Sequence, residues 1–292
     1  YTGSWKNRIV MIGDAPRSTD IGDKNAHMDD AERTAKIITN ASTGEFNIRR
    51  IYPDFYEREM TATGYRFPKA TEILTEEIKR GALMFNYSGH GSPAQISHSY
   101  IFESGDWDKV TSKALPLWVL ASCEILPYDQ EKNDFGRMAL FAPQGGAVAF
   151  MCASRAVYAT ENNALNIAFC EALVKQNNDG TYNTFGDAIR IAKNKLITTA
   201  QDRSINKLKY IIAGDPALRL MQPTQHIKVE AINGHTVNEE ESIKLKAGSI
   251  ASFEGHIEGL TNFEGILTAT LYDKTEELTC RNNGNVADEA FK

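Results

Sequence analysis

The sequence predicts an α/β protein built on a mainly parallel sheet, followed by a smaller β-rich region. Two observations lead to this class. Over residues 1–222, short apolar runs alternate with amphipathic stretches, and the apolar runs are nearly continuous, as in strands buried on both faces. From Gln225 onward the pattern changes to short alternating runs separated by Gly and Asn, which is typical of an antiparallel β-sandwich.

The first part of the α/β region contains three predicted strands and two predicted helices. The strands are expected at residues 8–14, 47–52 and 82–87, and the helices, from apolar residues at helical spacing, at residues 29–38 and 69–80. Gly81 ends the second helix, because glycine adopts the left-handed backbone angles of a helix end without steric cost.

The second part continues the alternation. Strands are expected at residues 117–122 and 146–152, and helices at residues 135–141, 163–175 and 185–199. Gly214-Asp215-Pro216 follows an apolar run and is interpreted as a turn. Strands and helices in this order predict a parallel sheet that is covered by helices on both faces.

The region from residue 223 to residue 292 is expected to form a second domain. Alternating runs predict strands at residues 226–232, 242–246, 250–257 and 265–272, with an Asn233-Gly234 turn after the first. An immunoglobulin-like sandwich has about seven strands. We therefore expect a partial sandwich that continues beyond Lys292.

Composition and charge limit the function classes. With 42% hydrophobic and 24% charged residues, the chain has an ordinary globular composition, which excludes a disordered or collagen-like protein. Residues 223–292 hold 6 basic and 12 acidic residues, so they carry the whole net charge of −6 and residues 1–222 are neutral. Neither region is basic, and no nucleic-acid partner is expected.

The sequence has no run of 18 apolar residues, so no membrane span is expected. It begins at Tyr1 with neither an initiator Met nor a signal peptide. We therefore expect a fragment or a processed product whose targeting signal lies elsewhere.

Three chemically active side chains follow three of the predicted strands. The first strand ends at Asp14, the strand at residues 82–87 leads into Gly89-His90-Gly91, and the strand at residues 117–122 is followed by Cys123. Because ligands meet the carboxyl ends of parallel strands, an acid, an imidazole and a thiol are expected at one edge of the sheet.

This set is suited to nucleophilic cysteine catalysis. An imidazole beside Cys123 increases the fraction of thiolate and later protonates the leaving amine, and a carboxylate holds the ring in the right orientation. The glycines around His90 allow a substrate backbone to approach, and the Gly91 N–H can stabilise an oxyanion. The sequence therefore predicts Cys123 and His90 as catalytic residues, with Asp14 as the orienting acid.

Structural interpretations compete with this one. Cys123 would be a small core residue, the glycine-flanked histidine an ordinary turn, and Asp14 the start of another turn. The joint placement of the thiol and the imidazole at strand ends favours catalysis. Cys152 and Cys170 lie within a strand and a helix pattern and are interpreted as packed thiols.

Other polar residues receive structural interpretations. His27 and Asp29 lie at the start of a predicted helix, where capping explains the acid. His98 is interpreted as a surface residue. The cysteines, of which Cys280 lies in the C-terminal region, show no CxxC spacing, so no metal site is predicted from the sequence.

Several motifs in order carry a likeness to a known family. They are WKNRIVMIGD at residues 5–14, NYSGHGS at residues 86–92, LWVLASC at residues 117–123 and GDPAL at residues 214–218. With them the chain resembles the gingipain family of cysteine peptidases over residues 5–222. The resemblance implies a caspase-like α/β/α sandwich followed by an immunoglobulin-like domain.

The resemblance also implies roles for individual residues. By motif matching, His90 and Cys123 form the catalytic dyad, and the main-chain amides of Gly91 and Cys123 form the oxyanion hole. The family's third residue, an acid after the first strand, falls on Asp14. Gingipains select basic side chains with a further acid, but Lys24 and Asn25 lie near its expected position here, which leaves trypsin-like specificity open.

Within the family, the segments at residues 122–129, 143–149 and 154–158 favour the members that act as sortases of the type IX secretion system in Bacteroidetes. Such an enzyme, at the outer membrane or cell surface, removes C-terminal sorting domains from secreted cargo. It forms a thioester on Cys123 and transfers the cargo to an amine on lipopolysaccharide. Other components of the secretion system are its expected partners.

No cofactor is required for this chemistry, although the resemblance allows a bound calcium ion. Two alternatives stay open at this point. One is a secreted gingipain-like endopeptidase without sortase activity, in which water is the acceptor. The other is a catalytically inactive homologue that only binds partner proteins.

Overall fold

The computed structural model describes residues 3–16, 25–42, 46–62, 64–130, 133–223, 225–238 and 243–259, and isolated positions or short segments after them. The described residues fall into two compact units. The first contains the residues up to Gln222 together with strands β15 (Leu278–Thr279) and β16 (Ala290–Phe291), and the second begins at Pro223. Within the described part of the chain, no helix is long and apolar enough to cross a membrane.

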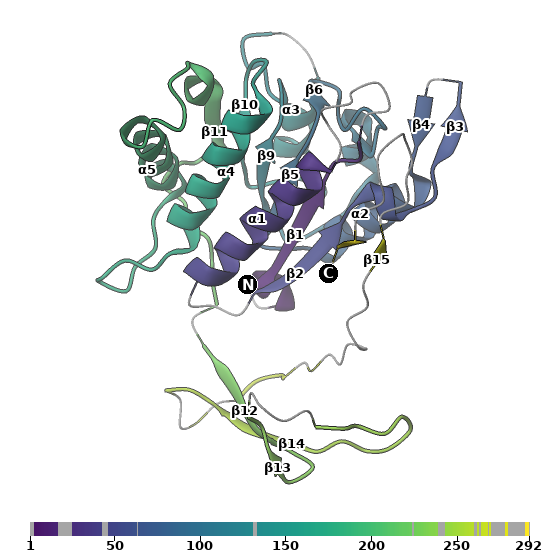
Figure 1. Cartoon of the computed structure of the whole chain (residues 1–292), viewed down its shortest axis with the longest axis vertical. Coiled ribbons are helices and arrows are strands. Elements are labelled where there is room, and N and C mark those ends of the chain that lie inside the picture. Colours follow the sequence, from purple (N-terminus) through teal and green to yellow (C-terminus); the bar gives the residue numbers. More distant parts are fainter. Residues whose placement is uncertain are drawn as a thin grey trace. The chain divides into compact units, whose positions relative to one another are not determined.

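A six-stranded sheet forms the centre of the first unit (Figure 1). Its order is β11 (Tyr210–Gly214), β10 (Ala149–Ala153), β9 (Leu117–Ala121), β5 (Met84–Ser88), β1 (Arg8–Gly13) and β2 (Asn47–Ile51). All neighbours pair in parallel except β10 and β11, which are antiparallel. The mainly parallel sheet is confirmed, and β11 is the apolar run that precedes the predicted turn at Gly214.

Helices cover both faces of this sheet. On one face lie α1 (Ala26–Ala41), α4 (Ala159–Val174) and α5 (Phe185–Thr198), and on the other lie α2 (Pro68–Arg80) and α3 (Phe135–Leu140). The α/β/α sandwich is therefore confirmed. α1 begins at Ala26, three residues before the predicted start, which places its first turn closer to the end of β1.

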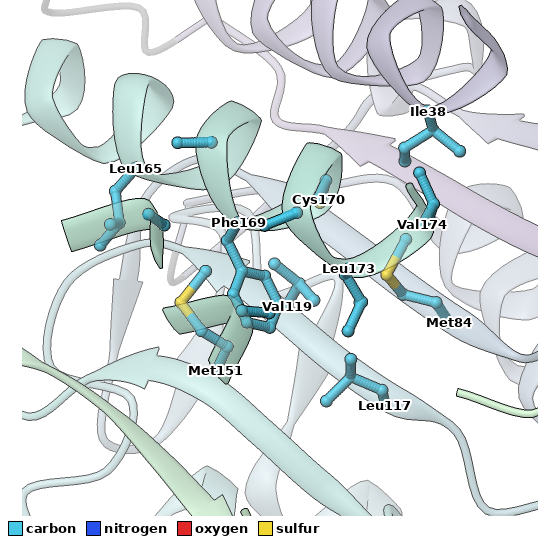
Figure 2. Packing of buried hydrophobic residues seen from close by; sticks show 14 of the residues in the cluster. Ile38, Met84, Leu117, Val119, Met151, Leu165, Phe169, Cys170, Leu173 and Val174 are labelled. Atoms are coloured by element: carbon cyan, nitrogen blue, oxygen red, sulfur yellow. The ribbon is translucent and has the colours of Figure 1, made fainter. Parts of the chain in front are cut away.

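The burial of both faces explains the continuous apolar runs. In β1, Ile9 and Met11 belong to the core under α1 and α4, whereas Val10 and Ile12 belong to the core on the opposite face. Figure 2 shows how α4 closes one face. The side chains of Leu165, Phe169 and Leu173 point toward the sheet residues Leu117, Val119 and Met151.

Small elements surround the sheet. They are the hairpin of β3 (Glu59–Thr61) and β4 (Gly64–Arg66), the three-stranded sheet of β6 (Gly91–Ser92), β7 (Gln95–Ile96) and β8 (Phe102–Glu103), and the 3₁₀ helices η1 (Ser4–Asn7), η2 (Pro53–Phe55), η3 (Ser104–Lys109) and η4 (Asn206–Lys209). The segment after His90 thus leaves the central sheet and forms a small sheet of its own.

The second unit contains β12 (Ile227–Ile232) between β13 (His235–Thr236) and β14 (Phe253–Ile257), all antiparallel. The predicted Asn233-Gly234 turn is present, with both residues at positive φ (52° and 76°).

Two of the predicted strands in this unit have a different outcome. The strand predicted at residues 242–246 is wrong over residues 243–246, which are irregular, and the described three-stranded sheet has the order β13-β12-β14. The strand predicted at residues 265–272 lies partly outside the described residues, and its described positions are not in a strand. The immunoglobulin-like sandwich stays a prediction.

Candidate active site

The strand register brings the three predicted site residues to one edge of the sheet. Gly13 of β1 pairs with Ser88 of β5, and Ser88 pairs with Ala121 of β9. Asp14, His90 and Cys123 each follow one of these strands by one or two residues. The three side chains therefore leave the sheet at the same level and from neighbouring strands.

Asp14 is buried and bound to the main chain around it. Its Oδ2 accepts a hydrogen bond from the His90 main-chain N–H at 3.1 Å, and its Oδ1 accepts one from Ala15 N–H at 2.9 Å. The Tyr87 hydroxyl lies 3.0 Å from Asp14 Oδ2 and 2.6 Å from the His90 carbonyl oxygen. These contacts fix the loop that carries His90, whereas the sequence analysis assigned Asp14 to the imidazole ring.

The carbonyl of His90 also determines where the Gly91 N–H points. It accepts a hydrogen bond from Ser97 N–H of the neighbouring segment at 2.9 Å. All described peptide bonds are trans, so the Gly91 N–H points to the opposite side, away from β7. This places a main-chain donor outside the small sheet, as an oxyanion hole requires.

The two glycines beside His90 are needed by the protein's own packing. A Cβ on Gly91 would lie 2.2 Å from Ser122 Oγ and 3.1 Å from the Cys123 carbonyl oxygen. A Cβ on Gly89 would lie 2.4 Å from the Asp14 Cβ. The glycines predicted to allow substrate approach therefore have a packing role too, since Gly91 lets the loop lie against the end of β9 and Gly89 lets it lie against Asp14.

Cys123 is partly exposed, and its Sγ lies against the main chain of Val157. The distances are 3.4 Å to the Val157 carbonyl oxygen and 3.5 Å to its amide nitrogen. Cys152 and Cys170 are buried, and burial raises the pKa of both thiols, that of Cys170 to about 12. They are packed thiols, as the sequence indicated, and Cys123 alone among the described cysteines is open to solvent.

The chain turns sharply after Cys123. Glu124 has a φ of 43°, in the left-handed region, and its N–H donates to the Arg155 carbonyl at 3.3 Å. The Leu126 N–H donates to the Ala153 carbonyl at the same distance. These bonds hold the segment after Cys123 beside the loop that begins at the end of β10.

The loop after β10, at residues 154–158, is bound to a neighbouring element. The Tyr158 N–H donates to Asn206 Oδ1 of η4 at 2.9 Å, and the Tyr158 side chain is 65% exposed. Tyr210 of β11 is buried in the core cluster against which Cys123 packs. Burial raises the pKa of its hydroxyl, and the negative charge of a Cys123 thiolate adds to the rise.

Two histidines that the sequence analysis set aside contact the His90 ring. The ring centroid of His27 lies 5.0 Å from that of His90 at an interplanar angle of 84°, and the centroid of His98 lies 4.3 Å away at 45°. His98 is exposed, as expected, but it is also part of the site.

His27 had been attributed to a helix start, together with the capping role of Asp29. The helix N-cap is Asn25, and Asp29 is an exposed residue of the first turn. A helix that follows β1 begins at the carboxyl edge of the sheet, and this signal could have identified His27. Within the described residues, no group of three or more His, Cys, Asp or Glu side chains is placed to hold a metal ion.

Comparisons with known proteins agree with this arrangement. Among solved structures, the arginine-specific cysteine proteinase gingipain R is 18% identical, with a TM-score of 0.57, over 77% of this chain and 50% of that one. The complex of the Porphyromonas gingivalis RgpB pro- and mature domains is 18% identical, with a TM-score of 0.56, over 77% and 51%. At these identities the likeness establishes the fold, and the chain spans about half the length of these structures.

No curated protein matches the chain. The family model described as Peptidase family C25 matches residues 1–221, which is most of the chain. This is the gingipain family, and its members are cysteine peptidases. The chain therefore belongs to peptidase family C25.

Proposed function

We propose that the chain is the catalytic part of a PorU-type sortase, a cysteine endopeptidase and transpeptidase of the type IX secretion system. One observation carries the proposal. The loop of His90 and Gly91 packs directly against Ser122 and Cys123, next to a thiol that solvent can reach. The groups that we assign as nucleophile, base and main-chain donor thus lie on neighbouring loops at one edge of the sheet, which supports the proposal.

The first half of the reaction is acylation. His90 takes the proton of the Cys123 thiol as Sγ attacks the scissile carbonyl of the cargo. The oxyanion that forms accepts hydrogen bonds from the main-chain N–H groups of Gly91 and Cys123. The C–N bond then breaks, His90 gives its proton to the leaving amine, and the C-terminal sorting domain departs from a cargo thioester.

The second half is transfer. An amine of lipopolysaccharide attacks the thioester and gives a proton to His90, a new amide bond forms, and the proton returns to the sulfur of Cys123 as it leaves. Water in place of the amine gives hydrolysis by the same steps. The acceptor that reaches the thioester therefore decides between a sortase and an endopeptidase.

The segments that resemble sortases support the transferase form of the proposal. Two of them contact one another: residues 122–129, which include Cys123, and residues 154–158. The Arg155 guanidinium forms an ion pair with the Asp129 carboxylate, and the Arg155 carbonyl accepts the Glu124 N–H. The segments whose sequence favours sortases thus lie together beside Cys123, which supports a role for them in admitting the acceptor.

The test uses this chain, a cargo protein that carries its C-terminal domain, and an amine acceptor. We expect a cargo–amine adduct by mass spectrometry, and its loss, by at least roughly 1,000-fold in rate, in Cys123→Ala and His90→Ala. Cys152→Ala serves as the thiol control and should keep the activity.

Two results would contradict the proposal. Hydrolysis without any adduct would identify an endopeptidase without sortase activity. No cleavage, with iodoacetamide labelling Cys123 no faster than Cys152 or Cys170, would identify a homologue that only binds its partners.

A further inference from the structure

The His90 ring lies between two other imidazoles whose surroundings differ. His27, from the first turn of α1, contacts it edge-on at 5.0 Å and is only 6% exposed. His98, from the turn after β7, contacts it at 4.3 Å but is itself exposed. The packing around a buried ring confines its orientation more tightly than the contacts of an exposed ring do. His27 is therefore the neighbour that can hold the His90 ring in place.

A buried carboxylate, that of Asp30, interacts with His27. Asp30 lies three residues later on the same face of α1, and it is 7% exposed. Burial raises the pKa of Asp30, while Arg33, His27 and a hydrogen bond from the Ser88 side chain act in the opposite direction. Arg33 also forms an ion pair with this carboxylate. The Asp30 carboxylate is thus close to the His27 ring and interacts with it electrostatically.

Asp30 also joins α1 to the strand that carries His90. Ser88 is the last residue of β5, two residues before His90. Figure 1 shows α1 lying along β1 and β5, with its first turn at the carboxyl edge of the sheet. Asp30 on α1 thus interacts with the last residue of the strand that leads to His90.

We propose that His27, held by Asp30, is a positioning residue that orients the imidazole of His90 for proton transfer with Cys123. This inference rests on the proposed function and assigns the main chain and the ring of His90 to different positioning groups. Asp14 holds the main chain of His90, and the buried His27 ring, with Asp30 beside it, holds the His90 ring in one orientation. A fixed orientation keeps the same ring nitrogen directed toward Cys123 when His90 takes the thiol proton.

The charged and titratable groups around His90 come from five parts of the fold. α1 contributes His27, Asp30 and Arg33, the end of β1 contributes Asp14, and β5 contributes Tyr87. The turn after β7 contributes His98, and Cys123 follows β9. Asp14 and Asp30 are the two carboxylates of this set. Asp14 binds the main chain of His90, whereas Asp30 interacts with His27.

The experiment compares His27→Phe and Asp30→Asn with wild type, using Asp29→Asn as the matched control. His27→Phe keeps a ring against His90 but loses the interaction with Asp30, and Asp30→Asn removes the charge at nearly constant shape. Asp29 is an exposed acid in the same helical turn. Thermal unfolding of each variant reports whether the fold is intact.

Two measurements report on positioning. We expect kcat for cargo cleavage to fall roughly tenfold in both variants with KM unchanged, because the proton acceptor is misplaced while substrate binding is not. We also expect the pH at which iodoacetamide alkylation of Cys123 reaches half its maximal rate to move to higher values. Asp29→Asn should match wild type in both measurements.

The alkylation measurement needs no substrate, so it separates the two proposals. Wild-type behaviour of His27→Phe and Asp30→Asn in both measurements overturns this inference and leaves the proposed function standing. A lower unfolding temperature with an unchanged pH profile also overturns it, since that result marks a purely structural role. A wild-type protein without cleavage and without selective labelling of Cys123 overturns the proposed function and this inference together.

Discussion

The two halves of the candidate site hold their key residues by different means. On the β1–β5 half, side chains surround His90: the Asp14 carboxylate, the Tyr87 hydroxyl and the rings of two histidines. On the β9–β10 half, Cys123 is held by main-chain groups, those of Val157 and of the loop beside it.

This difference has a consequence for substitutions. The side chains near His90 either bind its main chain, as Asp14 and Tyr87 do, or contact its ring, as two histidines do. Removal of one of them therefore acts directly on His90. A side chain near Cys123 matters only as far as it moves the loop of residues 153–158. We therefore expect the histidine half to respond to single substitutions more strongly than the cysteine half.

The largest effect is expected where the two halves meet. Gly91→Ala places a Cβ 2.2 Å from Ser122 Oγ, so the His90 loop must move away from the end of β9. We expect kcat/KM for cargo cleavage to fall by about 100-fold or more, since small displacements of catalytic groups have effects of that size. Gly105→Ala is the matched control, because a Cβ there meets no atom within 4 Å. Equal activity in the two variants would show that the close approach is not required.

Asp14→Asn tests the histidine half directly. Both carboxylate oxygens accept main-chain N–H groups, and an amide has only one acceptor oxygen, so one of the two bonds becomes a repulsive contact. We expect kcat to fall about tenfold with a smaller change in KM. Asp179→Asn is the control, since its carboxylate also accepts a main-chain N–H, in the turn after α4. An unchanged kcat in Asp14→Asn would remove the carboxylate from the list of positioning groups.

Asp202→Asn tests η4, the 3₁₀ helix that binds the loop beside Cys123. Burial opposes the ionisation of Asp202, but hydrogen bonds from Ser204 and from the Lys207 main chain outweigh it and lower the pKa below the usual 3.8. The folded state therefore favours the charged form, and this contribution to stability is present above about pH 4 and lost at lower pH.

We expect Asp202→Asn to lower the free energy of unfolding by about 1–3 kcal/mol at pH 7, as for hydrogen bonds to a buried charged group. Denaturant titrations between pH 7 and pH 3 should show the difference from wild type shrinking as the pH falls. A constant difference at every pH would mean that the carboxylate charge does not stabilise the loop. The rate of cleavage should change less than in Asp14→Asn, because Asp202 acts on Cys123 only indirectly. It binds η4, and η4 in turn binds the loop of residues 153–158.

The smallest effect is expected for Val157→Ala. Cys123 Sγ contacts the carbonyl and the N–H of Val157, and both groups remain in the variant. We expect kcat/KM to change by less than about twofold, and thermal unfolding to report a loss of about 1 kcal/mol from the smaller buried side chain. Val157→Pro removes the N–H and should reduce activity much more. A loss in Val157→Ala as large as that in Asp14→Asn would contradict the difference between the two halves.

Much of the architecture was predictable from local pattern. Strands buried on both faces need unbroken apolar runs, so β1, β5, β9 and β10 were identified with small errors at their ends. β11 was missed as a strand because it lies at an edge, where its residues are only partly buried, and because a turn follows it directly. Its antiparallel direction depends on pairing with β10, which no local pattern encodes.

The candidate site, like the fold, was predictable from the sequence only in part. The placement of Asp14, His90 and Cys123 at one edge follows from strand ends and the parallel direction of the sheet. The contacts of His27 and His98 with the His90 ring did not follow from the sequence. They depend on how α1 docks on the sheet and how the loop after β5 folds back, and neither is periodic in sequence.

Which residues stand at the edge of the sheet follows from local sequence pattern, because strand boundaries are set by short-range burial patterns. The contacts of those residues depend on how the elements pack against one another. Asp14 binds the main chain of His90, Gly91 packs on Ser122, and Asp30 reaches Ser88. Each of these contacts joins segments at least 30 residues apart, so it depends on packing between elements rather than on the pattern within any one of them.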